Sequence, residues 1–326
     1  MSIFDTIFAL FNGASAAGLT VPVILAIGFL LGLFHGATPD EHTWPITFSY
    51  SIGSYSTRGG ARAGLVFSTG FAVQRAILTA LGFLGLAAVY EAYNLDGYIY
   101  VAVGFVMFVA GWYLLRGSDI HLPLDGAMER LLGRFFTDHT HHTYTASPEH
   151  APVEGTKPIP LRMAVLHGFV AGWGVGGFAV ILIFVLAPQM PNVGWAALVG
   201  AVFGLGTMVM QILTGMLFAR LARLKKLSNG QIQSIGRRTA ARTLYMGGVA
   251  FMAVGTVVAA LPWLEDYYLA TGTSIPNLDQ IGIATLLIVL VVGVIGGNSL
   301  WKAYREATRS HAAPPGPEET HPPESV

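Results

Sequence analysis

Long runs of apolar residues alternate along the chain with short polar segments, and the length of these runs predicts the architecture. A membrane-spanning helix needs about 20 mostly apolar residues. We find such runs over 19–36, 63–90, 97–115, 161–187, 194–219, 243–263 and 279–301, and the first of them can continue towards residue 50. The pattern predicts an all-α polytopic membrane protein with about seven transmembrane helices, preceded by a short interfacial helix over Ile3–Phe11.

Composition agrees with this class. Only 11% of the residues are charged, against about 25% in an average soluble protein, and the mean hydropathy is +0.58. The formal net charge is zero, so bulk charge predicts no nucleic-acid partner, and the sequence indicates no oligomeric state. The chain contains no cysteine, which excludes disulfides, thiolate metal sites and dithiol redox chemistry.

The basic residues predict an orientation in the membrane. All but one of the 18 lysines and arginines lie in the polar segments 37–62, 116–162 and 220–242 or after residue 301, and the exception is Arg75. In the alternate connecting segments all charged residues are acidic, and there is no lysine or arginine. Lysine and arginine accumulate in cytoplasmic loops, so we expect a multi-pass protein of the cell (inner) membrane with its N-terminus outside and its C-terminus in the cytoplasm.

Short matches recur in the same order in the two halves of the chain, and they pair 33–36 with 165–168, 74–79 with 211–214, and 104–111 with 248–255. Each half would hold three spans, an odd number, so the halves would have opposite orientations. Inverted repeats of this kind are typical of transporters, whose sites lie on broken helices. The predicted core is two inverted three-helix repeats with broken first and fourth helices.

The expected organisation is an N-terminal interfacial segment, a first three-helix repeat, a cytoplasmic histidine-containing loop, a second three-helix repeat, a peripheral additional transmembrane helix and a disordered cytoplasmic tail. These units would cover 1–18, 19–116, 117–160, 161–263, 264–301 and 302–326.

The candidate chemistry is concentrated in the stretch HGATPDEH, residues 35–42. On an unbroken helix His35 and His42 would share one face and Asp40 would point elsewhere. Pro39 removes the helical hydrogen bond to the His35 carbonyl, and Pro45 would do the same for Glu41, so a break here would let the side chains converge. The candidate metal ligands of this stretch are His35, Asp40, Glu41 and His42, and imidazole with carboxylate suits nickel, cobalt, zinc or copper better than magnesium or calcium alone.

Other polar residues inside the predicted spans are candidates for the same site. His167 occupies the repeat position of His35 and is followed by a glycine-rich stretch. Arg75 is expected to pair with Asp40 or Glu41 or with water in a vestibule, because an isolated arginine is costly in lipid. Gln74 and Gln211 occupy matching positions and would bond across the two halves or line the path.

A second cluster of histidines lies in the loop after the third run and consists of His139, His141, His142 and His150. One interpretation is a metal-collecting or metal-sensing loop. The other is a flexible polar loop in which the histidines are incidental.

The stretch LFHGATPDEHTWPI, residues 33–46, resembles the first signature of the nickel/cobalt permeases, in which an aspartate and a histidine follow four residues after a histidine. It is also similar to the His-Pro-His motif of the nickel/cobalt efflux branch. Here one extra residue separates Asp40 from His42. The resemblance implies transport of a divalent transition metal, with His35, Asp40 and His42 as ligands. The core also looks distantly like the cytochrome c biogenesis membrane proteins, whose redox cysteines this chain lacks.

The sequence therefore predicts a secondary transporter that moves a divalent transition-metal cation, nickel or cobalt, as its substrate. Coupling to protons is expected because no nucleotide-binding motif is present, and the histidine loop favours efflux slightly. No enzymatic activity and no resident cofactor are expected. The alternatives are a metal-dependent membrane oxidoreductase and a metal-sensing or assembly protein of the membrane.

Overall fold

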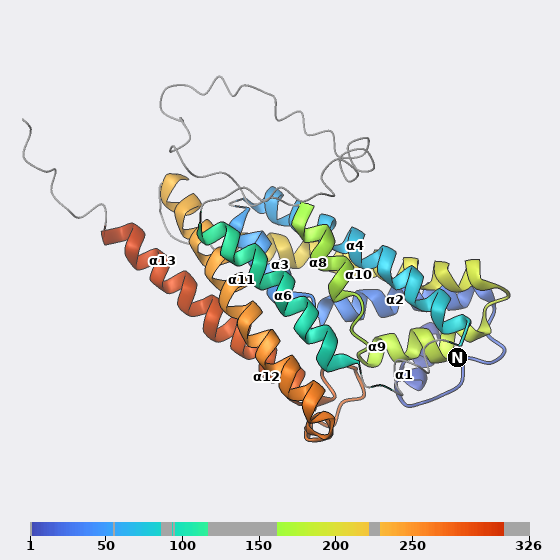
Figure 1. Cartoon of the computed structure of the whole chain (residues 1–326). Coiled ribbons are helices and arrows are strands. Elements are labelled where there is room, and N and C mark those ends of the chain that lie inside the picture. The colour runs from blue at the N-terminus through green and yellow to red at the C-terminus, as the bar shows by residue number, and fades with distance from the viewer. Residues whose placement is uncertain are drawn as a thin grey trace, which may run out of the picture.

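The computed structural model of the chain describes residues 2–54, 56–85, 93, 95–116, 162–221 and 229–309. These residues are almost entirely helical, which confirms the expected class (Figure 1). The predicted histidine loop, with its candidates His139, His141, His142 and His150, lies outside the described residues, as does the predicted tail beyond residue 309.

The helices follow one another along the chain with the bounds α1 Ile3–Phe11, α2 Val21–Ala37, α3 Trp44–Gly53, α4 Thr57–Phe83, α6 Asp96–Leu115, α8 Arg162–Ala171, α9 Gly177–Val180, α10 Val193–Leu221, α11 Asn229–Ala260, α12 Ile283–Ile288 and α13 Gly297–Arg309. Two segments are π-helical, Ile181–Leu186 and Val289–Gly296. Two short segments are 3₁₀-helical, Ala187–Gln189 and Pro262–Asp266. The strands β1 (Leu269–Ala270) and β2 (Gln280–Ile281) form one small antiparallel hairpin.

Among the described residues, five helices are long and apolar enough to cross a membrane. They correspond to the second, third, fifth, sixth and seventh predicted spans. The first and fourth predicted spans contain shorter apolar helices, Val21–Ala37 and Gly177–Gln189. The coarse expectation of a multi-pass helical protein therefore agrees with the structure, and the two shorter spans are those in which the sequence places proline or clustered glycine.

Several helix ends differ from the expected ones. α4 begins at Thr57, where Ser56 accepts a hydrogen bond from the Gly59 amide, and ends before Gly85, whose φ is +79°. α11 begins at Asn229, so Arg237, Arg238 and Arg242, which were expected in a loop, lie on a helix instead. The last helix reaches Arg309, because Glu306 pairs with Arg238 and Arg242 of α11 and holds the final turns against it.

The first predicted span is interrupted between Ala37 and Trp44. Thr38 is extended, and its hydroxyl donates to the His35 carbonyl that Pro39 leaves without a helical partner. Pro45 acts differently from the expectation. It occupies the first turn of α3, where a missing amide hydrogen does no harm, so it starts the second helix and does not break the first.

The fourth predicted span is interrupted over 172–176, between α8 and α9. This segment is rich in glycine, and two of its glycines are required by close neighbours. A side chain at Gly174 would overlap the ring of His42, and one at Gly172 would overlap the side chain of Gln74. The two interruptions, which are far apart in the sequence, are therefore packed against each other.

Close contacts at glycines define the relative directions of the long helices. Gly64 of α4 lies against the Gln211 backbone of α10, and Gly200 of α10 lies against the Arg75 backbone of α4. Residue numbers rise along one helix as they fall along the other, so α4 and α10 are antiparallel. α6 and α11 are also antiparallel, as the contacts of Gly97 with Ala259 and of Gly111 with Tyr245 require.

The helices that precede the two interruptions pack in a different way. Gly28 and Gly36 of α2 lie against Val199 and Thr207 of α10, so α2 and α10 run parallel. α8 and α4 also run parallel, because Gly168 contacts Phe67 and Phe71 and Gly172 contacts Gln74. Figure 1 shows α6, α11 and the α12–α13 segment as one group of helices that crosses the group of α2, α4 and α10.

The seventh span is the least buried of the five long apolar helices, in line with the peripheral position expected for it, but it contacts the helices of the core. Gly296 touches the ring of Phe48 on α3, and the same segment packs along α11. The hairpin segment that precedes α12 reaches both helix interruptions. Asn277 donates to the Thr38 hydroxyl at 3.4 Å, and Pro276 lies against Gly177. This part of the chain therefore covers the region where the two interruptions meet.

The glycine contacts predict which substitutions the fold tolerates. Gly168→Ala would drive a methyl group into the Phe67 carbonyl, and Gly32→Ala would do the same at Phe203. Overpacking of this kind typically lowers stability by about 1–3 kcal/mol. We expect both variants to unfold at lower temperature than the parent protein in detergent micelles. Gly297→Ala has open space and serves as the matched control. Equal stability of all three variants would contradict this packing.

Candidate metal centre

The side chain of Asp40 organises the first interruption. Its Oδ1 accepts hydrogen bonds from the backbone amides of His42 at 3.0 Å and Thr43 at 2.8 Å. These bonds hold the turn that leads into α3 and aim the following side chains. The other carboxylate oxygen, Oδ2, lies 3.8 Å from Nδ1 of His35. Asp40 therefore stands between the end of α2 and the remaining polar residues of the interruption.

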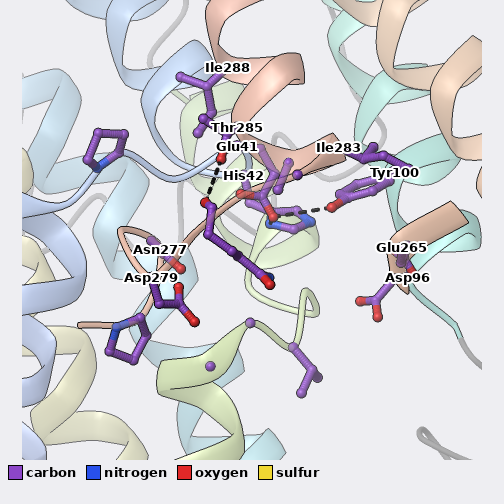
Figure 2. A pocket seen from close by; sticks show the side chains of 18 residues that line it. Glu41, His42, Asp96, Tyr100, Glu265, Asn277, Asp279, Ile283, Thr285 and Ile288 are labelled. Atoms are coloured by element: carbon purple, nitrogen blue, oxygen red, sulfur yellow. Dashed lines mark hydrogen bonds and ion pairs between the residues drawn. The ribbon is translucent and has the colours of Figure 1, made fainter. Parts of the chain in front are cut away.

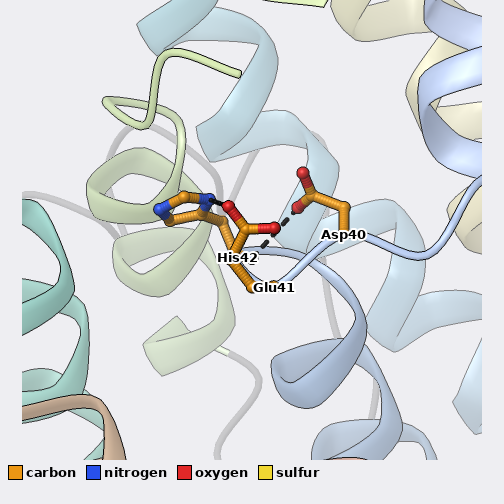
Figure 3. Close-up of side chains that lie close together, drawn as sticks. All are labelled: Asp40, Glu41 and His42. Carbon is orange, nitrogen blue, oxygen red and sulfur yellow. Dashed lines mark hydrogen bonds and ion pairs between the residues drawn. The ribbon is translucent and has the colours of Figure 1, made fainter. Parts of the chain in front are cut away.

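Asp40, Glu41 and His42 form a compact buried group (Figure 3). One ligand atom from each residue lies within 4.8 Å of the others, and all three residues are at most 8% exposed. Nδ1 of His42 is 3.1 Å from Oε1 of Glu41. Tyr100 of α6 stacks on the His42 ring and donates its hydroxyl to Glu41 at 3.3 Å.

His35 lies beside this group and not within it. Its ring is stacked between Phe71 of α4 and Phe203 of α10, with centroid distances of 5.5 and 5.2 Å, and the edge of Phe178 closes a third side. Neither ring nitrogen has a hydrogen-bond partner among the described residues. The compact group therefore contains Glu41, and the expected set of His35, Asp40 and His42 is divided between two neighbouring positions.

Arg75 ties the second interruption to α4. Its guanidinium donates to the carbonyl of Gly174 at 3.0 Å and lies 4.7 Å from the centre of the Phe71 ring. The sequence predicted Asp40, Glu41 or vestibule water as its partner. One hydrogen bond of Arg75 goes to a backbone carbonyl of the interrupted segment, and its positive charge also acts on Asp40, one of the expected carboxylates. Gly174 in turn touches His42, so Arg75 also sets the position of the wall behind that imidazole.

His167 lies four residues before the end of α8 and is outside the compact group. Its Nδ1 is 2.9 Å from both the Tyr50 hydroxyl of α3 and the Met163 carbonyl. When Nδ1 carries the proton it donates to the Met163 carbonyl, and when it does not it accepts from the Tyr50 hydroxyl. Nε2 of His167 has no hydrogen-bond partner among the described residues.

The two matched glutamines lie near different interruptions. Oε1 of Gln211 accepts a hydrogen bond from Thr47 of α3 at 2.6 Å. The side chain of Gln74 packs at Gly172, and its amide atoms have no hydrogen-bond partner within the described part of the chain. Gln211 thus forms the kind of bond between the two halves that the sequence suggested, and Gln74 occupies the corresponding place at the other interruption.

A cavity of about 300 Å³ opens beside the compact group (Figure 2). Glu41 and His42 form part of its wall, and three further carboxylates line it from other segments, namely Asp96, Glu265 and Asp279. Sequence reasoning did not select these three residues as functional. They lie in connecting segments whose charged residues are all acidic, a pattern that by itself indicates orientation in the membrane and not a binding site.

No protein-family model matches the chain, and no solved structure matches it significantly. The resemblance over residues 33–46 to the nickel/cobalt transporters therefore stays a prediction from the motif.

The Arg75 contact predicts how firmly the second interruption is held. A buried hydrogen bond to a charged group contributes about 1.5–3 kcal/mol, so its loss would favour opening by about tenfold or more. The chain has no cysteine, and a single Val175→Cys substitution therefore reports on this segment directly. We expect a maleimide to label the introduced thiol markedly faster after Arg75→Gln. Arg220→Gln, an exposed position on α10, is the control. Unchanged labelling after Arg75→Gln would contradict this role.

Proposed function

We propose that the protein is a secondary transporter of a divalent transition-metal cation, nickel or cobalt, and that the cation binds at Asp40, Glu41 and His42. The observation that carries the proposal is the convergence of their ligand atoms within 4.8 Å at an interrupted helix. Two ligands on one ion lie within roughly 4.4 Å, twice a metal–ligand distance of about 2.2 Å. Small side-chain rotations would therefore complete the site.

The charge of the group supports a cation as its ligand. Removing a carboxylate from water raises its free energy by several kcal/mol unless another charge or strong hydrogen bonds compensate. Asp40 and Glu41 bring two carboxylates into the same buried region. A divalent ion would neutralise both while His42 supplies the nitrogen ligand that distinguishes transition metals from magnesium or calcium.

The neighbouring residues suggest a transport path with several successive binding positions for the cation. The cavity meets the compact group at Glu41 and His42, and Asp40 connects that group to His35 at 3.8 Å. Both nitrogens of His35 are without hydrogen-bond partners among the described residues, as a transient ligand requires. A cation would pass from the cavity to the compact group and then towards His35. Several successive positions of low affinity allow the ion to bind and also to leave again.

Helix directions support two inverted repeats around this path. The matched second helices α4 and α10 are antiparallel, and so are the matched third helices α6 and α11. The first helix of each half packs parallel to the second helix of the other half, α2 with α10 and α8 with α4. A two-fold axis in the membrane plane relates elements in this way. With the N-terminus outside, the cavity would open to the exterior.

Transport can be measured directly in proteoliposomes loaded with a metal-sensitive dye. We expect saturable nickel or cobalt flux in the parent protein. Flux should fall by at least about tenfold in Glu41→Gln and in His42→Ala, because each lost ligand weakens binding by more than about 1.4 kcal/mol. Isothermal calorimetry on the same preparations would show the matching loss of affinity.

Asp266→Asn is the control for charge, since Asp266 is exposed and lies outside the cavity wall. Near-parental flux in both Glu41→Gln and His42→Ala would refute the proposed site. Deletion of residues 137–150 separates transport from sensing: a transporter retains flux through its helices, whereas a sensor that depends on the histidine loop loses its metal response.

Acid on the loading side should inhibit transport. A metal ion binds neutral imidazole and must displace protons to do so, so protonated histidine competes with the metal. Flux should slow as the loading-side pH falls through the range of ordinary histidine titration near about 6.5. The measurement is vesicle flux at several loading-side pH values with the membrane potential clamped. Constant flux between about pH 5 and 8, a range that spans the histidine value, would indicate a uniport channel and not proton exchange.

A further inference from the structure

The cavity beside the compact group has the features of a binding site in its own right. Its wall combines the start of α6, the segment 175–177, the hairpin segment that precedes α12, and the first turn of α12. Figure 2 shows Asp279, Glu265 and Asp96 around the space, with Glu41 and His42 above it near Tyr100. No lysine or arginine is among the described residues that line it.

The side-chain oxygen atoms of the wall are all hard ligands. They include the carboxylates of Glu41, Asp96, Glu265 and Asp279, the amide of Asn277 and the hydroxyl of Thr285. Oxygen ligands of this kind suit hard divalent cations such as calcium, magnesium and manganese. A cleft lined by one sign of charge also concentrates ions of the opposite sign. The wall would therefore attract divalent cations with little discrimination between them.

His42 provides an independent indication that a ligand binds at the inner wall. The residue is 94% buried, since only 6% of its surface is exposed. Its Nδ1 faces Glu41, and its Nε2 has no hydrogen-bond partner among the described residues. A buried nitrogen without a partner costs about 1–3 kcal/mol. A cation or its bound water at the inner end of the cavity would remove that penalty.

We propose that this cavity is a second, outer cation-binding site, which holds a hydrated divalent cation on carboxylate oxygens and exchanges it with the buried group through Glu41. Glu41 belongs to both sites, because it lines the cavity and is one of the three converging ligands. The outer site collects or releases divalent cations in general, and the imidazole of the inner site selects among them. The exchange with the inner site rests on the proposed transport function, but cation binding in the cavity does not.

Terbium luminescence tests the outer site without any transport assay. Terbium(III) prefers oxygen ligands, and it emits when a nearby tyrosine or tryptophan absorbs light; Tyr100 lines the cavity. Purified full-length protein should give a saturable signal that calcium or manganese displaces. Glu265→Gln with Asp279→Asn should raise the half-saturating terbium concentration by at least about tenfold, because two charges near the ion are lost.

Asp266→Asn is the matched control, because it removes one charge from the same segment outside the cavity wall. We expect its half-saturation to stay within about twofold of the parent, since an exposed charge that does not line the cavity is screened by solvent and salt. Equal half-saturation in the parent and the double variant would overturn the outer site. Thermal unfolding of each preparation shows whether the double variant is folded.

A second variant keeps all the carboxylates and does not depend on the stability of the double variant. Thr285→Cys places a single thiol in the cavity wall of a chain that has no other cysteine. A positively charged thiol reagent should react at least about tenfold faster than a negatively charged one, because an acidic cleft raises the local concentration of cations. Manganese should slow the positive reagent. Equal rates for the two reagents, or no effect of manganese, would overturn the proposal.

Flux measurements separate this inference from the transport function. If both are correct, the double variant needs more external metal for half-maximal flux but reaches the parental maximum. Terbium binding without nickel or cobalt flux in the parent would refute the transport function and leave the outer site standing. Parental flux with unchanged terbium binding in the double variant would refute the outer site alone.

Discussion

The structure depends on one constraint, which is that polar groups at membrane depth must be covered by protein. Two helices are interrupted, and the two interruptions pack against each other. The backbone carbonyls that lose their helical partners there bond with side chains. Arg75 donates to the Gly174 carbonyl in one interruption, and Thr38 donates to the His35 carbonyl in the other. The long helices α4 and α10 can approach closely enough to enclose this region because glycines form their contacts.

The same constraint explains the chemistry of the site. Where a helix is interrupted, residues that a regular helix would point in different directions can converge, as Asp40, Glu41 and His42 do. Asp40 uses one oxygen to hold the turn and keeps the other towards His35. One side chain thus both stabilises the turn and connects it to His35. The acidic cavity beside Glu41 extends this region towards the segment that precedes α12.

The all-helical class and the positions of the long spans could be predicted because apolar run length follows directly from bilayer thickness. Pro39 and the glycines after His167 likewise identified where helices are interrupted, because proline removes a backbone donor whatever its surroundings. Helix ends were predicted less well. The first turns of α11 are polar, and their helicity depends on packing, as the pairing of Arg238 and Arg242 with Glu306 illustrates.

The sequence by itself determined which ionisable residues lie within the apolar runs, and such residues are candidates for function by default. Only the tertiary structure decided which of them meet. Glu41 joined the compact group, His35 was held beside it between two aromatic rings, and His167 bonded Tyr50. Asp96, Glu265 and Asp279 come from segments far apart in the chain. Their convergence follows from long-range helix packing, which no local pattern of residues encodes.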